Sequence, residues 1–312
     1  MCNEIQENIN SIERPTELRV DTNKIISALK NRGCLEKDIQ FIMQLIDGQE
    51  VYDVSGYSGC STIITKSYDT GIKEYCIKIC DILGNLEKEA YIWSIMAKWG
   101  MTSNFVKYVS TNKDYLVTIR ISEPMALYKY QDASELTKYM GMTLRRFHNM
   151  PWKDQYLTKD EISFFERKGI HQYETAINNK QGLRFIADDL GSNDYDAMKK
   201  YLKEFKSLCK FDEVLIHGDY NPRNVFAISP DKTWFVDMTD MCFGDRHYDI
   251  FFAIWTLQFY FGINKDIQKA KKCEEMFIDA YGRDVFDDNR YNYCKYLVCM
   301  YWNEHNDLVH IV

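Results

Sequence analysis

The segment Leu215–Phe226, together with Trp234–Asp237, constrains the fold of this 312-residue chain more than any other part of its sequence. Two apolar runs lead into polar residues, the first into Asp219 and Asn224 and the second into Asp237. Ordinary turns explain these residue types but not their order, spacing and apolar flanks. Phosphoryl transfer requires a carboxylate that accepts a hydroxyl proton and oxygen ligands for magnesium. The segment predicts that chemistry.

A strand-like pattern covers residues 49–124 and predicts a small antiparallel sheet with one helix. The predicted strands and helix are, in chain order, the strands Ser61–Ser67 and Glu74–Cys80, the helix from Leu86 to Lys98, and the strands Val106–Ser110 and Tyr115–Ile121. In the second strand, alternation places Lys78 on the face opposite to Ile77 and Ile79. Lys78 is therefore expected to share a face of the sheet with Cys76 and Cys80.

The pattern of residues 125–312 is mainly helical. The predicted helices are Leu136–Asn149, Ser163–Asn179 and Tyr195–Leu208, with short strands at Glu213–Ile216 and Trp234–Val236. The apolar run Ile250–Gly262 is too short to span a membrane, so it predicts a buried helix. Residues 1–48 are predicted to form an N-terminal helical extension. The chain thus divides into this extension, a sheet-rich lobe and a helical lobe.

The motif His217-Gly218-Asp219, followed by Asn224 and by Asp237 after an apolar run, is similar to the Brenner-type motif of aminoglycoside phosphotransferases and choline-kinase-like enzymes. Its pattern most resembles the aminoglycoside 3'-phosphotransferases. The resemblance implies an α+β, two-lobed, protein-kinase-like fold, with a small antiparallel-sheet N-lobe and a larger, mostly helical C-lobe. It also implies that Asp219 is the catalytic base, that His217 orients the loop, and that Asn224 and Asp237 bind Mg²⁺.

The nucleotide side of the site follows from the same resemblance. Lys78 is expected to contact the α- and β-phosphates, with Glu89 as its ion-pair partner in preference to Glu87. A phosphate loop is expected at Ser55, Gly56, Ser58 and Gly59, and the hinge for the purine base at Ser122 and Glu123. The next hinge residue, Pro124, lacks an N–H group, so the choice between ATP and GTP as donor stays open.

Two further parts of the resemblance concern the C-lobe. His148 closes the helix Leu136–Asn149, and we expect it to be structural, with a cation there favoured by the helix dipole. Four carboxylates are expected to line the substrate pocket: Asp160, Glu161, Glu304 and Asp307. Aminoglycosides carry several ammonium groups, so an acidic pocket suits them.

Composition narrows the range of partners. A net charge of −7 and a pI near 5.5 argue against binding to nucleic acid or an anionic membrane, which would need clustered cations. A small cationic substrate is compatible with this charge. Ten cysteines without paired CxxC spacing, and no signal-peptide pattern in the first residues, predict reduced thiols and a cytoplasmic location.

The leading prediction is a magnesium-dependent kinase that phosphorylates an aminoglycoside and thereby confers resistance. One alternative is a metabolic kinase of the same fold for choline, a sugar or another amino alcohol. A protein kinase is disfavoured because Asp237-Met238-Thr239 stands where those enzymes have Asp-Phe-Gly. A nucleotide-binding pseudokinase is also disfavoured, since Lys78, Asp219 and Asp237 are all intact.

Overall fold

The computed structural model describes most of the chain. The described residues are 18–54, 60–69, 71–84, 86–121, 132–151, 173–174, 177–178, 195–208, 212, 214–229, 232–263 and 266–302. They pack into two compact units. The N-terminal unit holds the described residues of 18–121 and 226–239, and the C-terminal unit holds those of 132–225 and 240–302. Residues 226–239 follow Asp219 and Asn224 in sequence. Their contacts nevertheless assign them to the sheet-rich N-terminal unit.

The N-terminal unit is built on one antiparallel sheet in the order β1-β2-β3-β4-β6-β5. Its strands are β1 (Leu18–Arg19), β2 (Glu50–Asp53), β3 (Cys60–Lys66), β4 (Tyr75–Cys80), β5 (Phe105–Ser110) and β6 (Asp114–Ile119). The last four confirm the predicted strands, with bounds that differ by one or two residues. The first two were not predicted, because so short a strand shows no alternation to read.

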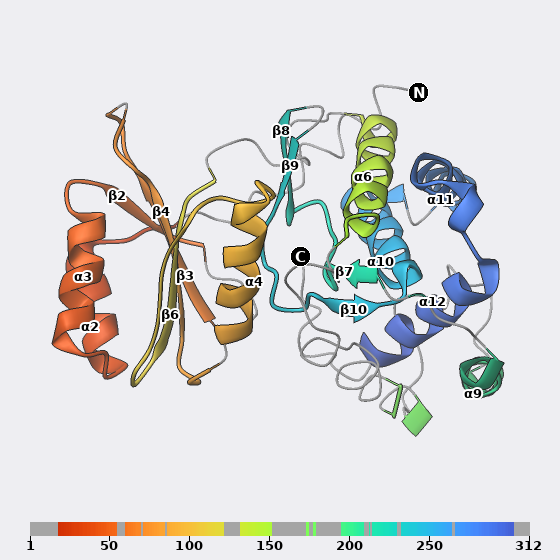
Figure 1. Cartoon of the computed structure of the whole chain (residues 1–312), viewed down its shortest axis with the longest axis horizontal. Helices are drawn as coiled ribbons and strands as arrows, with labels where there is room; N and C mark the ends of the chain where they lie inside the picture. The colour runs from red at the N-terminus through yellow and green to blue at the C-terminus, as the bar shows by residue number, and fades with distance from the viewer. Residues whose placement is uncertain are drawn as a thin grey trace. The chain divides into compact units, whose positions relative to one another are not determined.

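Helices cover both faces of this sheet (Figure 1). The helices α2 (Thr22–Asn31) and α3 (Glu36–Ile46) lie on one face, and α4 (Glu87–Lys98) lies on the other. A single hydrophobic core joins α2 and α3 to the sheet through Ile25, Leu29, Ile39, Ile42, Ile46, Val51, Ile63, Ile77, Ile79, Tyr115 and Val117. Because Ile77 and Ile79 enter that core, Lys78 between them points to the α4 face, as alternation predicted.

The C-terminal unit is mainly helical (Figure 1). Its helices are α6 (Ala133–His148), α9 (Tyr195–Leu208), α10 (Arg246–Tyr260), α11 (Ile267–Tyr281) and α12 (Asp288–Trp302), with a 3₁₀ turn η4 (Arg283–Val285). α10 is buried along most of its length, which confirms the prediction for that apolar run. No helix among the described residues is long and apolar enough to span a bilayer.

Helices α6 and α11 approach each other closely at Gly141. A Cβ atom on this glycine would lie 2.8 Å from the carbonyl oxygen of Phe277 and 3.0 Å from the Cβ of Ala280. Only a residue without a side chain fits this contact. The close packing fixes the C-terminal end of α6, which carries His148.

Short strands frame the catalytic motif. β7 (Val214–Ile216) pairs with β10 (Cys242–Gly244), and β8 (Val225–Ser229) forms a hairpin with β9 (Lys232–Phe235). The hairpin accounts for the spacing between Asn224 and Asp237. β10 was not predicted, because three residues are too few for a pattern. The predicted helices that became α6 and α9 are confirmed, whereas Ser163–Asn179 lies almost wholly outside the described residues.

Candidate active site

The catalytic loop starts where β7 ends, and α10 holds its backbone. The Asp249 carboxylate accepts hydrogen bonds from the backbone N–H groups of His217, at 2.6 Å, and Gly218, at 2.9 Å. Asp249 and His217 are both fully buried. A buried carboxylate with two backbone donors is a strong, charge-assisted contact. It sets the direction in which the chain enters Asp219.

The Asp219 side chain is held by two amides of its own loop. Asn221 donates to Oδ1 at 2.9 Å, and Asn224 donates to Oδ2 at 2.7 Å. The backbone N–H of Asp219 also donates a hydrogen bond to Nδ1 of His217, at 3.3 Å. Asp219 is only partly buried, and the two amide donors fix the orientation of its carboxylate. Sequence reasoning missed Asn221, although an Asn-Pro pair two residues after a catalytic acid was a usable signal.

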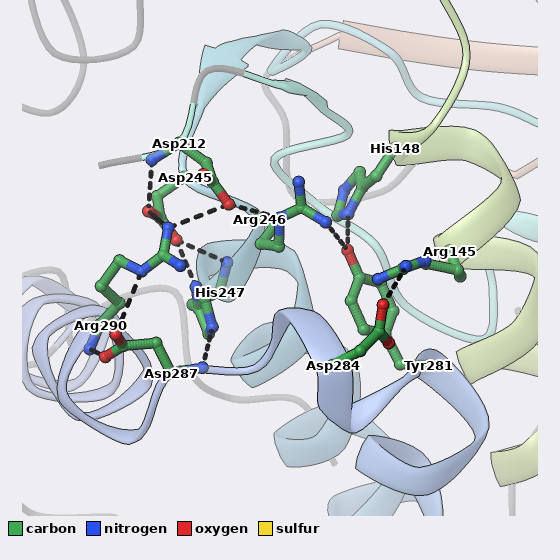
Figure 2. A network of polar contacts seen from close by, with 10 residues as sticks. All are labelled: Arg145, His148, Asp212, Asp245, Arg246, His247, Tyr281, Asp284, Asp287 and Arg290. Atoms are coloured by element: carbon green, nitrogen blue, oxygen red, sulfur yellow. Dashed lines mark hydrogen bonds and ion pairs between the residues drawn. The ribbon is translucent and has the colours of Figure 1, made fainter. Parts of the chain in front are cut away.

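Behind the loop, a chain of polar contacts leads from Asp249 to His148, and Figure 2 shows its continuation from His148 through Tyr281 to Arg246 and Asp212. The imidazole of His148 has a partner on each side. Its Nε2 lies 3.2 Å from the Asp249 carboxylate, and its Nδ1 lies 2.8 Å from the Tyr281 hydroxyl. That hydroxyl accepts from Arg246, which is paired with Asp212 at 2.5 Å. Since a carboxylate only accepts, Nε2 carries the imidazole proton and Nδ1 accepts from Tyr281.

The charge state of His148 differs from the expectation based on the helix dipole. Burial lowers the pKa of His148 below its ordinary value, and the attraction of Asp249 does not reverse this. The imidazole is therefore neutral at pH 7. The structural role expected for His148 holds, but as a neutral hydrogen-bonding group rather than as a cation.

A second polar cluster lies within the N-terminal unit. The Lys78 ammonium lies 2.8 Å from Oε2 of Glu89 and 3.1 Å from Oδ1 of Asp237. The predicted Lys78–Glu89 ion pair is therefore present. Thr239 donates its hydroxyl to the same Oε2 at 2.9 Å, a contact that sequence reasoning missed. Four residues from three separate parts of the chain thus share one polar cluster.

The electrostatics of this cluster keep Lys78 charged. Burial by itself would lower the pKa of Lys78, but the carboxylates of Glu89 and Asp237 outweigh it and raise the pKa. Glu89 is only 2% exposed, whereas the Asp237 side chain is 45% exposed. The cluster therefore presents a fixed cation beside an accessible carboxylate, which suits phosphate groups together with a metal ion.

Asp237 adopts an uncommon backbone conformation. Its φ of 56° is the one positive value among the described residues other than glycine. Asp tolerates this left-handed region better than most residues, at a modest cost in free energy. The bend brings the side chains of Asp237 and Thr239 toward Lys78 and Glu89.

Each unit contains a side chain whose oxygen chemistry fits a magnesium ligand. Asn224 uses its amide nitrogen to bind Asp219, which leaves its carbonyl oxygen for a metal, and Asp237 uses only Oδ1 toward Lys78. Mg²⁺ prefers oxygen ligands and is often held by one or two protein groups plus phosphate oxygens. Among the described residues, no group of three or more His, Cys, Asp or Glu side chains is arranged to hold a metal ion by itself.

Several predicted site residues lie outside the described part of the chain. These are Ser55, Gly56, Ser58 and Gly59 of the phosphate loop, Ser122 and Glu123 of the hinge, and Asp160, Glu161, Glu304 and Asp307 of the substrate pocket. Their roles stay predictions.

Gly218→Ala is expected to disrupt the catalytic loop. The backbone φ of Gly218 is +80°, and an added Cβ would lie 2.6 Å from the carbonyl oxygen of Asp240. We expect a loss of about 2 kcal/mol in the free energy of unfolding from strain and overlap. Turnover should fall as well, because the displaced backbone carries Asp219. Gly33→Ala is the matched control, since Gly33 has a φ of +76° but no atom within 4 Å of the added Cβ. Equal losses in both variants, measured by denaturant unfolding, would contradict the role of the overlap.

Comparison with known proteins agrees with this geometry. Residues 115–290 match the model of the phosphotransferase enzyme family. A probable aminoglycoside 3'-phosphotransferase of Lactococcus lactis subsp. lactis (strain IL1403) is 25% identical over 277 residues, which cover 88% of this chain and 94% of the relative.

Solved structures show the same fold at low identity. An aminoglycoside 3'-phosphotransferase of type VIII superposes with a TM-score of 0.60 at 17% identity, over 85% of this chain and 98% of the other. A choline kinase from Streptococcus pneumoniae superposes with a TM-score of 0.55 at 16% identity, over 87% of this chain and 89% of the other. These likenesses confirm the predicted α+β, kinase-like fold. The family match covers more than half of the sequence, and this chain therefore belongs to the phosphotransferase enzyme family and is a kinase.

Proposed function

We propose that this kinase transfers the γ-phosphoryl group of ATP or GTP to a hydroxyl of an aminoglycoside antibiotic. The observation that carries the proposal is the fixed orientation of Asp219, whose two carboxylate oxygens accept from Asn221 and Asn224. A carboxylate held in this way suits the orientation of a substrate hydroxyl and the acceptance of its proton as the new O–P bond forms. His217 acts through the loop backbone rather than on the substrate.

The residues of the N-terminal unit serve the donor. Lys78 binds the α- and β-phosphates, and Glu89 keeps its ammonium group in place. Asn224 and Asp237 are the residues that would hold Mg²⁺. When bound, this metal ion neutralises charge on the β- and γ-phosphates. The functional division of the chain, with nucleotide binding in residues 49–124 and the substrate pocket in residues 125–312, belongs to this proposal, as do the phosphate loop and the hinge.

The net charge of the chain and its sequence similarity to a relative support an aminoglycoside as the substrate. The chain carries a net charge of −7, and the relative from Lactococcus lactis bears the name of an aminoglycoside 3'-phosphotransferase. We assign the binding of the substrate ammonium groups to Asp160, Glu161, Glu304 and Asp307, because a polycation needs several carboxylates around the reacting hydroxyl. The second candidate is choline or another amino alcohol, which the likeness to a choline kinase favours. A single quaternary ammonium group would need an aromatic cage instead.

A substrate panel tests the proposal. Purified enzyme with Mg²⁺ and either ATP or GTP is offered kanamycin-type and gentamicin-type aminoglycosides, choline, ethanolamine and simple sugars, and nucleotide consumption and phosphorylated product are measured. Asp160→Ala and Glu304→Ala should raise KM for the aminoglycoside by about tenfold, the value of one lost charge pair. Asp69→Ala, an exposed acid in the turn after β3, is the control and should leave KM unchanged. Transfer to choline but to no aminoglycoside would replace the first candidate with the second.

A further inference from the structure

Thr239 contacts a carboxylate that the proposed mechanism depends on. Its hydroxyl lies 2.9 Å from Oε2 of Glu89, the oxygen that also binds Lys78 at 2.8 Å. The two residues are 150 positions apart in sequence. A carboxylate oxygen accepts, so the Thr239 hydroxyl is the donor. Glu89 therefore receives one charged and one neutral donor on a single buried oxygen.

The segment from Asp237 to Thr239 contacts both members of the Lys78–Glu89 ion pair. Asp237 binds Lys78 at 3.1 Å, and Thr239, two residues later, binds Glu89. Met238 between them is fully buried, which fixes the segment in the core. The stretch that would supply a metal ligand is thus attached to the lysine through Asp237 and to its acidic partner through Thr239.

We propose that Thr239 is a positioning residue for phosphate binding: its hydroxyl holds Glu89, so that Lys78 stays between Glu89 and Asp237. The inference rests on the proposed role of Lys78 in nucleotide binding. Without the hydroxyl, Oε2 loses one of its two donors, and Glu89 is freer to rotate. Lys78 then pairs more closely with Asp237, which removes the cation from the phosphates and occupies the carboxylate assigned to Mg²⁺.

Thr239→Val tests the inference, because valine keeps the branched shape and removes only the hydroxyl. We expect KM for the nucleotide to rise about tenfold, the effect of one lost hydrogen bond to a charged group. KM for the acceptor should not change, and the Mg²⁺ concentration for half-maximal rate should increase. Thr239→Ser restores the donor, so nucleotide KM should return to near the wild-type value.

Two comparisons separate positioning from a general structural role. Thr65→Val is the matched control, since Thr65 is fully buried in the same unit and its hydroxyl oxygen accepts from the backbone of Tyr75 at 2.8 Å, away from this cluster. It should leave nucleotide KM unchanged. In a Lys78→Ala background, Thr239→Val should cause no further loss of Mg-ADP affinity in calorimetry, because it acts through the lysine.

The outcomes distinguish this inference from the proposed function. If the wild type binds Mg-ADP and Thr239→Val binds it equally well, the role of Thr239 is overturned while the kinase assignment stands. The same holds if Thr65→Val raises nucleotide KM as much as Thr239→Val, or if the effects of Thr239→Val and Lys78→Ala multiply. If the wild type binds no Mg-nucleotide, the nucleotide-binding role of Lys78 is wrong, and the role of Thr239 is wrong with it.

Discussion

Asp219→Asn is expected to lower turnover by a factor of about a hundred or more, the usual contribution of a positioned general base. The asparagine keeps the size of the side chain but cannot accept the proton of the substrate hydroxyl. One of the two amide donors, Asn221 or Asn224, would also face an NH₂ group in place of a carboxylate oxygen. Nucleotide affinity should be largely unchanged, because the residues assigned to the phosphates lie elsewhere in the chain.

Steady-state turnover and calorimetric titration of Mg-ADP together check this expectation. Asp279→Asn is a suitable control, since its exposed carboxylate on α11 forms a surface ion pair with Arg283 of the same unit. The control should match the wild type in both measurements. Near-normal turnover of Asp219→Asn would rule out Asp219 as the base, and a parallel loss of nucleotide affinity would indicate a general disruption of the loop.

Asp237→Ala is expected to remove nearly all activity and to weaken metal-dependent nucleotide binding. The substitution deletes the carboxylate assigned to Mg²⁺ and leaves Lys78 with Glu89 alone. Loss of a metal ligand and of a partner for a buried cation should together reduce Mg-nucleotide affinity by about a hundredfold. Titrations of nucleotide with and without Mg²⁺ separate the two effects, because only the first depends on the metal.

Asp81→Ala is the matched control for this variant. Asp81 has a side chain that is 51% exposed and lies 3.4 Å from Lys113 in the same unit, close to the values for Asp237 and Lys78. Its removal should change neither the metal requirement nor nucleotide affinity, because surface ion pairs contribute little. If Asp237→Ala retained the wild-type dependence of nucleotide binding on Mg²⁺, the assigned metal role would have to be abandoned.

Much of the fold could be predicted because its elements carry clear local patterns. Alternation in β4 placed Lys78 opposite to Ile77 and Ile79, and the structure agrees. The apolar run that became α10 was long enough to be read as a buried helix. By contrast, β1, β2 and β10 have two to four residues each, too few to show a periodic pattern in the sequence. Such short strands are stabilised by the strands they pair with.

The charge state of His148 shows a different limit of sequence reasoning. Its position at the end of α6 favoured a cation, since a helix C-terminus attracts positive charge. In the folded protein this end is buried against Tyr281 and Asp249, and desolvation keeps the ring neutral. Burial depends on which distant segments cover a residue, and Tyr281 and Asp249 are both more than a hundred residues from His148 in sequence.

The sequence by itself determined the order and spacing of the catalytic motif, because the numbers of residues that separate Asp219, Asn224 and Asp237 are properties of the chain alone. Only the tertiary structure decided what holds these residues. Asp249 reaches back to the loop from 31 residues downstream, and Thr239 reaches Glu89 across 150. Spacing is a property of the local chain, whereas a hydrogen-bond partner is selected when distant segments pack and every buried polar group must find a donor or acceptor.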